Sequence, residues 1–252
     1  MTFRIMYRAR AENLDKGEII IEKIDKKLIS EQVSIALREY ERTGFVHKGP
    51  AENFRGFIAE LVFNQFLKEL GLKENIDYQW NKRRLDYFET TDEKSKWDFK
   101  LLRSGLKFEI GAAKPSHRYA VMKAAGYKKE SDCFVQVQIK SLNCVAKVFY
   151  EGKDRWYKFD EKSESEGFVE ITSDEQIKTF EQAEQSVIAK TVICGYDMVK
   201  TITKEEDGWE FSRAGAVITP NDDGYVKPLS ELNSPRELGE LVRRLGRQKT
   251  LS

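Results

Sequence analysis

Apolar and polar residues follow two different periods along this chain, one typical of helices and one typical of strands. Apolar residues three or four positions apart after Ser30 predict a helix over residues 30–44, with Ser30 as its N-cap and Gly44 as its stop. A second helix is expected over residues 50–70, just before Gly71. This segment is apolar almost all round, which predicts that the helix is largely buried.

The stretch NSPRELGELVRRLG near the end of the chain is a further predicted helix. Ser234 is its N-cap, Pro235 is its first helical residue, and Glu237 completes a capping box. Strand-like patterns occur in EIIIEKI, CFVQVQIKSL, CVAKVFYEG and SVIAKTVICGYDMVKTI. Helices and strands in this order predict an α/β fold of the mixed α+β kind, with a central mixed β-sheet flanked by helices.

The length of the chain fits a single domain over residues 1–252. Its core is expected to comprise about residues 30–150 and 186–246. The polar, acidic segment at about 151–185 is expected to be an insertion or arm. Residues 115–132 are expected to form a loop with a short helix.

The segment WDFKLLRSGLKFEIGAAKP, residues 97–115, alternates with a period of two and predicts a β-hairpin. Only a loop with an even number of residues keeps its apolar side chains on one face. We expect a two-residue loop at Ser104-Gly105, which places Lys100 opposite Glu109. The apolar face then contains Phe99, Leu101, Leu106, Phe108 and Ile110.

The other face of this hairpin carries two carboxylates. In the expected register Asp98 faces Gly111 and lies diagonal to Glu109. Like charges this close repel unless a cation lies between them, and Mg²⁺ favours carboxylate, water and phosphate oxygens. The alternative is an ordinary cross-strand ion pair between Lys100 and Glu109.

Another carboxylate, Glu60 in RGFIAELVFNQF, lies among phenylalanines on the second helix. Such surroundings are costly for a carboxylate unless a metal or a hydrogen-bonding partner meets it. Glu60 either contributes to a site, or lies at the edge of the core, where it could pair with a cation such as Arg55.

Composition narrows the choice of partners. Charged residues make up 34% of the chain but the net charge is only +1, so any nucleic-acid surface must come from local clusters. Three cysteines without a CxxC spacing and two histidines argue against zinc, and Cys133 and Cys144 are expected to be buried thiols. Without a secretory signal or a run of about 18 apolar residues, we expect a cytoplasmic protein with no membrane partner.

The order of a buried Glu on a helix, an Asp, and a hairpin leading to Glu-x-Lys resembles the PD-(D/E)xK nuclease superfamily, over residues 50–140. GFIAEL is similar to its acidic helix and matches Glu60, WDF is similar to the PD element and matches Asp98, and FEIGAAK is similar to the (D/E)xK strand and matches Glu109. The resemblance implies a restriction-endonuclease-like core. It also implies Mg²⁺, with Mn²⁺ as a substitute, held by these three carboxylates for the hydrolysis of DNA.

This chain departs from the motif at Gly111, which stands where the family has its lysine. Lys100 and Lys114 are the preferred replacements, ahead of Lys107. Lys114 turns toward the carboxylates only if a bulge at Gly111 changes the alternation of the strand. If no lysine serves, the domain is a weak or inactive nuclease.

Three hypotheses stay open. The leading one is a Mg²⁺-dependent DNA endonuclease of restriction, phage or repair type, for which a homodimer is a reasonable assembly. The second is a nuclease-fold protein that binds nucleic acid or assembles without cutting, and the third is a structural or protein-interaction domain. Basic clusters that could hold a DNA backbone are Lys82-Arg83-Arg84, Lys123 with Lys128-Lys129, and Arg243-Arg244.

Overall fold

The computed structural model describes residues 7–43, 50–81, 97–123, 131–160, 167–182, 188–199, 208–212 and 224–246. Its helices are α1 (Lys26–Thr43), α2 (Pro50–Glu69), α3 (Asp174–Gln182) and α4 (Pro235–Gly246), with short 3₁₀ turns η1 (Leu14–Lys16) and η5 (Leu229–Glu231). Its strands are β1 (Tyr7–Asn13), β2 (Glu18–Ile24), β3 (Tyr78–Trp80), β4 (Phe99–Leu101), β5 (Lys107–Ala113), β6 (Tyr119–Lys123), β7 (Cys133–Asn143), β8 (Val145–Tyr150), β9 (Lys153–Phe159), β10 (Phe168–Ile171), β11 (Ile188–Met198), β12 (Glu210–Ser212) and β13 (Gly224–Pro228).

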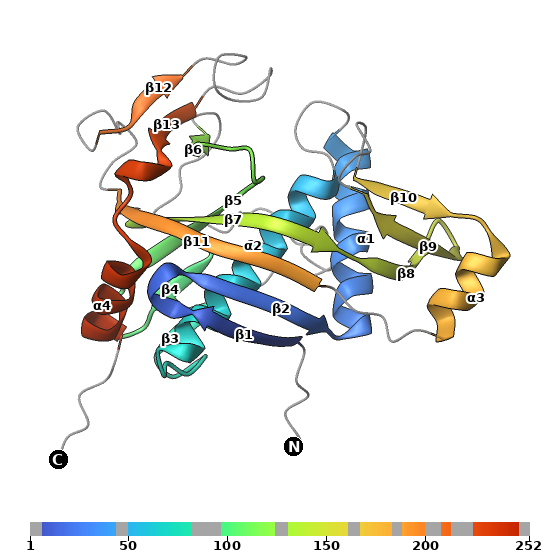
Figure 1. The fold of residues 1–252 in the computed structure, drawn as a ribbon, viewed down its shortest axis with the longest axis horizontal. Coiled ribbons are helices and arrows are strands. Elements are labelled where there is room, and N and C mark those ends of the chain that lie inside the picture. Colours follow the sequence, from blue (N-terminus) through green and yellow to red (C-terminus); the bar gives the residue numbers. More distant parts are fainter. Residues whose placement is uncertain are drawn as a thin grey trace.

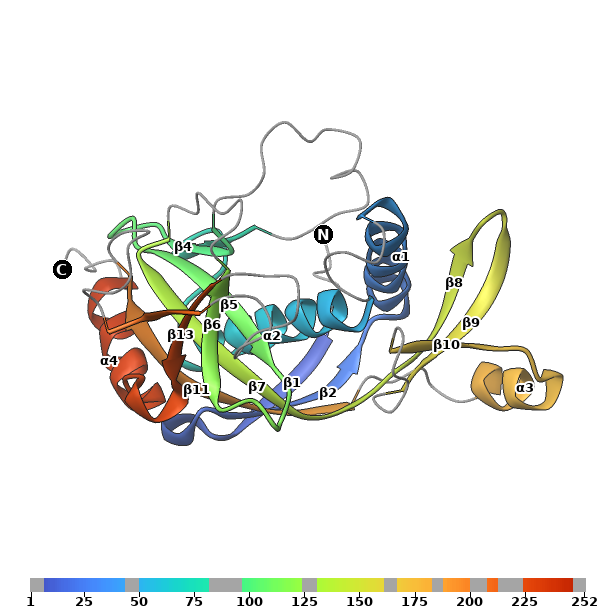
Figure 2. The same cartoon turned by 90° about the horizontal axis from the view of Figure 1, so that it is seen from above.

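A seven-stranded sheet in the order β1-β2-β11-β7-β5-β4-β3 forms the centre of the molecule. Its neighbouring strands are antiparallel except β5 and β7, which run parallel, so the sheet is mixed. The sheet curls, and α2 lies inside the curve (Figures 1 and 2). The predicted α+β class with a central mixed sheet and flanking helices is therefore confirmed.

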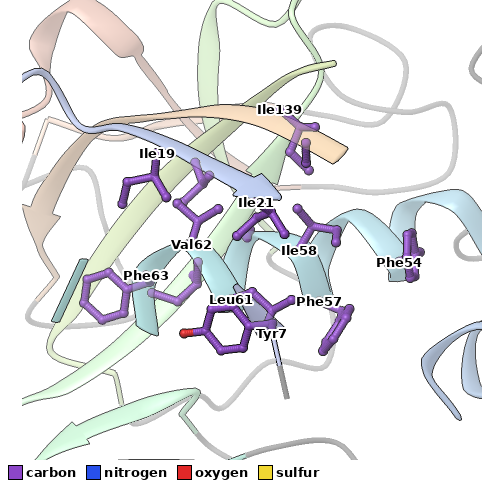
Figure 3. Close-up of a cluster of buried hydrophobic side chains, with 14 of the residues drawn as sticks. Tyr7, Ile19, Ile21, Phe54, Phe57, Ile58, Leu61, Val62, Phe63 and Ile139 are labelled. Atoms are coloured by element: carbon purple, nitrogen blue, oxygen red, sulfur yellow. The ribbon is translucent and has the colours of Figure 1, made fainter. Parts of the chain in front are cut away.

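Helix α2 fills the concave side of the sheet, as its sequence predicts. Fifteen of its residues are buried, because this helix is surrounded by sheet strands and by α1. Figure 3 shows its apolar side chains meeting isoleucines of β2 and Ile139 of β7. The predicted buried helix is confirmed, and its bounds fall within a residue of those expected.

Helix α1 begins earlier than the sequence predicts. Asp25 accepts hydrogen bonds at Oδ1 from the backbone N–H groups of Lys27 (2.9 Å) and Leu28 (3.4 Å), so it caps the helix. The predicted N-cap, Ser30, therefore lies within the first turns of the helix and that prediction is wrong. Two residues able to cap stand five positions apart, and the sequence alone did not distinguish them.

A buried polar seam holds the two edges of the curled sheet to α2. The Asn64 side chain donates through Nδ2 to the hydroxyl of Tyr7 on edge strand β1, at 2.9 Å, and accepts a hydrogen bond from the hydroxyl of Tyr78 on edge strand β3. Lys68 donates to the Tyr7 hydroxyl at 3.3 Å. Burial raises the pKa of both phenols above the usual value, so both keep their protons at neutral pH.

The convex face of the central sheet is partly covered by a small sheet in the order β12-β13-β6. Phe134 of β7 meets Trp209 edge to face at 5.4 Å, and Asp197 of β11 pairs with Lys227 of β13. The Trp209 indole also donates to Asp197 at 3.1 Å. The short helix expected within residues 115–132 is not seen where the chain is described, because Tyr119–Lys123 forms strand β6.

A third sheet, β10-β9-β8, lies with α3 at one end of the molecule (Figures 1 and 2). Strands β9 and β10 and helix α3 all belong to the segment expected to be an arm, and α3 packs on the sheet through Phe180 and Trp156, whose ring centroids are 6.5 Å apart. Cys133 and Cys144 are buried thiols, as expected. Among the described helices, none combines the length and apolar character needed to span a bilayer.

Candidate functional site

The hairpin of β4 and β5 has the predicted faces but a longer loop. Leu101 donates its N–H to Leu106 O at 2.9 Å, and Gly105 donates to Leu101 O at 2.9 Å with a left-handed φ of 77°. The loop is therefore the four residues between Leu101 and Leu106, and Lys100 lies opposite Lys107. The predicted two-residue loop at Ser104-Gly105, with its pairing of Lys100 to Glu109, is wrong.

Loops of two and four residues both contain an even number of residues. This explains why the faces of the hairpin were predicted correctly although its loop and register were not. Phe99, Leu101, Phe108 and Ile110 are buried in the core, as the alternation predicts. The hydrophobic pattern therefore fixed the faces, but it could not distinguish two registers that differ by two residues.

Asp98 lies against β5 at the start of β4. Its N–H donates to Phe108 O at 2.9 Å, and its side-chain Oδ2 accepts a hydrogen bond from the N–H of Ile110 at 2.7 Å. These two contacts bracket Glu109, so Asp98 and Glu109 are neighbours on adjoining strands. The predicted pairing of Asp98 with Gly111 is replaced by this closer approach to Glu109.

Glu60 is buried, with only 4% of its surface exposed, and it meets a hydrogen-bond donor. Its Oε2 accepts from the indole N–H of Trp80 at 2.9 Å. Trp80 belongs to β3 and stacks on Phe99 of β4, with ring centroids 5.5 Å apart. Glu60 is thereby linked through one indole to the residue next to Asp98.

Glu60 and Glu109 lie on different sides of the sheet. Phe108 and Ile110 point into the core that contains α2, so the alternation of β5 turns Glu109 to the other face. Within the described residues, no three or more His, Cys, Asp or Glu side chains lie close enough together to hold a metal ion. Asp98 and Glu109 are thus brought together, whereas Glu60 lies on the core side of the sheet, where it meets Trp80.

Two of the three candidate lysines lie near Asp98 and Glu109, and the third lies farther away. Lys100 and Lys107 are directly opposed, two residues along the strands from Asp98 and Glu109. The register of β5 with β7 runs without a shift from Phe108 to Ala113, so the bulge that would redirect Lys114 is absent. Lys114 is four residues beyond Ile110, about 13 Å along an extended strand. Lys114 is therefore remote from Asp98.

Gly111 is closely packed. A Cβ atom at this position would lie 2.5 Å from Cζ of Phe134 and 3.1 Å from Oε1 of Gln136. Gln136 itself donates to Gly111 O at 2.8 Å. No side chain, and so no lysine, fits at position 111 unless Phe134 moves.

Sequence reasoning missed one contributor to this region. Trp80 was not recognised as the partner of Glu60, although a tryptophan in the strand-like DYQW segment was a visible signal. The strand pattern around Gln138 indicates a glutamine with hydrogen-bond partners, but it does not say which groups the amide contacts. Among the predicted basic clusters, Arg243 and Arg244 lie in the last turn of α4. Lys82-Arg83-Arg84 and Lys128-Lys129 lie outside the described residues, and Lys123 is described only as part of β6.

The carboxylates of this region suit a single cation that keeps part of its water shell, rather than a cation enclosed by protein ligands. Mg²⁺ in proteins is commonly held by one or two carboxylates together with water and phosphate oxygens. Asp98 and Glu109 provide such a pair, and Glu60 is engaged by an indole.

Comparison with known protein families, curated proteins and solved structures found no match for this chain.

Proposed function

We propose that this chain is a Mg²⁺-dependent DNA endonuclease of restriction, phage or repair type, built on a restriction-endonuclease-like core. The observation that carries the proposal is the position of Asp98, fixed to β5 by its N–H and by its carboxylate on either side of Glu109. Two adjacent carboxylates at the start of a hairpin, after a buried Glu on the preceding helix, match the order of acidic residues in the PD-(D/E)xK superfamily.

In this proposal Asp98 and Glu109 hold the metal and Glu60 supports the site from the core. A bound Mg²⁺ would lower the pKa of a coordinated water and offset charge on the phosphate. The backbone N–H of Ile110 holds the Asp98 carboxylate in one orientation, so little ordering is needed when the metal arrives. The Trp80 indole N–H likewise holds the Glu60 carboxylate in one orientation.

Lys100 and Lys107 are the proposed counterparts of the missing lysine. The two lysines are directly opposed on an antiparallel pair, and a phosphate there could accept hydrogen bonds from both ammonium groups. Both lysines lie on the strands that carry Asp98 and Glu109. The proposal therefore places the scissile phosphate over this part of the hairpin.

A cleavage assay on plasmid and single-stranded DNA tests the proposal. Wild type, Asp98→Asn and Asp154→Asn are compared with Mg²⁺, Mn²⁺ or EDTA. Asp154 is the control, because it lies on β9 and pairs with the exposed Lys147 of β8. We expect metal-dependent cutting that Asp98→Asn loses and Asp154→Asn keeps. Cutting that persists in EDTA, or in Asp98→Asn, would contradict the proposal.

The second candidate is a nuclease-fold protein that binds nucleic acid without cutting it. The packing of Phe134 against Gly111 favours it, because no side chain fits at the usual lysine position unless Phe134 moves. Salt-sensitive DNA binding by the wild type without cleavage under any metal condition would support this candidate over the first.

A further inference from the structure

Six consecutive residues, Lys114 to Tyr119, are exposed just after β5 ends. They contain Lys114, His117 and Arg118, an aromatic ring at Tyr119, and no acidic side chain. Residues 114–118 are named the basic turn below. It is separate from the basic clusters that the sequence pointed to.

The basic turn is fixed to the central sheet by one buried amide. Gln138 of β7 is 5% exposed. Its Nε2 donates to the carbonyl oxygens of Lys114 at 3.1 Å, Pro115 at 3.0 Å and His117 at 3.2 Å. Leu229 of η5 adds a hydrogen bond to Arg118 O at 2.9 Å. The carbonyls of the turn thus face the protein, and its side chains face outward.

The same amide adds a further cation to this surface. Lys140, exposed on β7, donates through Nζ to Oε1 of Gln138. Gln138 thereby joins the ammonium group of Lys140 to the basic turn. An exposed loop ordinarily loses conformational entropy when it binds, whereas a turn already held in place loses less.

We propose that the basic turn and Lys140 bind the phosphate backbone of nucleic acid. Exposed Lys, Arg and His side chains with no acidic residue among them in the turn are suited to phosphate oxygens, and Tyr119 offers a ring for stacking. Glu52 of α2 acts on His117 from outside the turn. A nucleic acid is favoured over a phosphorylated peptide because the turn continues β5, the strand that carries Glu109.

The distance along β5 gives the position of the contact, and this step rests on the proposed function. Lys114 is five residues beyond Glu109, about 17 Å along an extended strand. One strand of duplex DNA advances about 3.4 Å per phosphate, so this distance corresponds to about five phosphates. The basic turn would hold the backbone about half a helical turn from the phosphate at Asp98.

The test is a binding measurement that requires no cleavage. The anisotropy of a fluorescein-labelled 30-base-pair duplex is followed in EDTA, from 50 to 200 mM NaCl, with full-length protein. Lys114→Gln/Arg118→Gln is compared with wild type and with a matched control, Lys153→Gln/Lys158→Gln, whose lysines are exposed on β9. The plot of log K against log salt has a negative slope. We expect its magnitude to be smaller by about 1.8 in the turn variant, at about 0.9 per phosphate contact. The control should keep the wild-type slope.

A second variant separates positioning from charge. Gln138→Met keeps a similar volume but removes the amide that holds the turn. We expect weaker binding with a salt slope close to that of wild type, in protein whose thermal melting confirms folding. This result would identify Gln138 as a positioning residue.

Equal affinity and slope for the turn variant and wild type would overturn the inference, as would binding of a phosphorylated peptide in place of DNA or no binding of DNA at all. No binding of DNA at all would count against the proposed function as well, whereas the following outcomes separate the two. Metal-dependent cutting with an unaffected turn variant would refute only the basic turn. Turn-dependent binding without any cutting would refute only the endonuclease.

Discussion

At the scale of single residues, the environment of each side chain matters more than its chemical type. Glu60, Asp98 and Glu109 are all carboxylates, yet Glu60 meets an indole in the core, whereas Asp98 meets a backbone N–H and lies beside Glu109 on the other side of the sheet. The sequence identified these three residues. It could not indicate which of them would meet, because that depends on register and on the curl of the sheet.

Gly111 provides a direct test of residue-scale packing. Gly111→Ala should lower the free energy of unfolding by about 1–3 kcal/mol, because its Cβ would overlap the Phe134 ring. Gly56→Ala is the matched control, since no atom lies within 4 Å of its Cβ position and α2 favours alanine there. Urea unfolding measures both variants. Similar free energies for Gly111→Ala and wild type would show that position 111 is open and could accept a lysine.

His117 makes the proposed phosphate contact sensitive to pH. Burial, Lys114 and Arg55 lower the pKa of His117 below its usual value, and Glu52 opposes them. A bound phosphate favours the imidazolium and raises this pKa, so DNA binding should take up a proton. Affinity should therefore increase as the pH falls from about 7.5 to 5.5. His117→Gln should remove that increase in the anisotropy titration, and an unchanged pH profile in this variant would be inconsistent with the contact.

At the scale of elements, features encoded within one segment were predicted correctly, and features that depend on packing against the rest of the molecule were not. Helices α2 and α4 were predicted because apolar periodicity and caps are encoded within each segment. The start of α1, the length of the β4–β5 loop and strand β6 were mispredicted, because each has two locally acceptable solutions. Packing against the rest of the molecule selects between those solutions.

The capping box of α4 is an element-scale prediction with a pH signature. Ser234 donates its N–H to Glu237 Oε2 at 2.7 Å, and Glu237 donates its N–H back to Ser234 Oγ at 3.3 Å. The Ser234 hydroxyl also donates to Glu237 Oε2 at 2.8 Å, and this bond together with the bond from the Ser234 N–H lowers the pKa of Glu237. The stabilisation is therefore complete above the ordinary carboxyl pKa of about 4.3 and is lost as the pH falls through the lowered value.

Ser234→Ala should cost about 1 kcal/mol of stability near pH 7. The Ser234→Ala variant should also lose less stability than wild type between pH 6 and pH 3, because it lacks the hydroxyl that donates to Glu237 and lowers the Glu237 pKa. Urea midpoints measured across this range check both statements. Parallel pH profiles for the two proteins would mean that the box does not act on Glu237.

At the scale of the whole molecule, one asparagine joins the two ends of the curled sheet. Asn64→Leu should lower the free energy of unfolding by about 2–4 kcal/mol, because it removes the partners of two buried phenols at once. Gln65→Ala is the control on the same helix, since Gln65 bonds to Glu69 at the exposed surface. Comparable midpoints for the two variants would show that the seam does not hold the sheet edges.

The arrangement of the whole molecule also defines the central question, which is whether Asp98 and Glu109 form a working metal site. The decisive measurement is cleavage of a 30-base-pair duplex with Mn²⁺ by wild type, Asp98→Asn, Glu109→Gln and Glu60→Gln side by side. We expect Asp98→Asn and Glu109→Gln to lose at least two orders of magnitude in rate, and Glu60→Gln to lose less. Equal rates for wild type and Asp98→Asn, or no cutting by the wild type, would contradict the assignment of this hairpin as a catalytic centre.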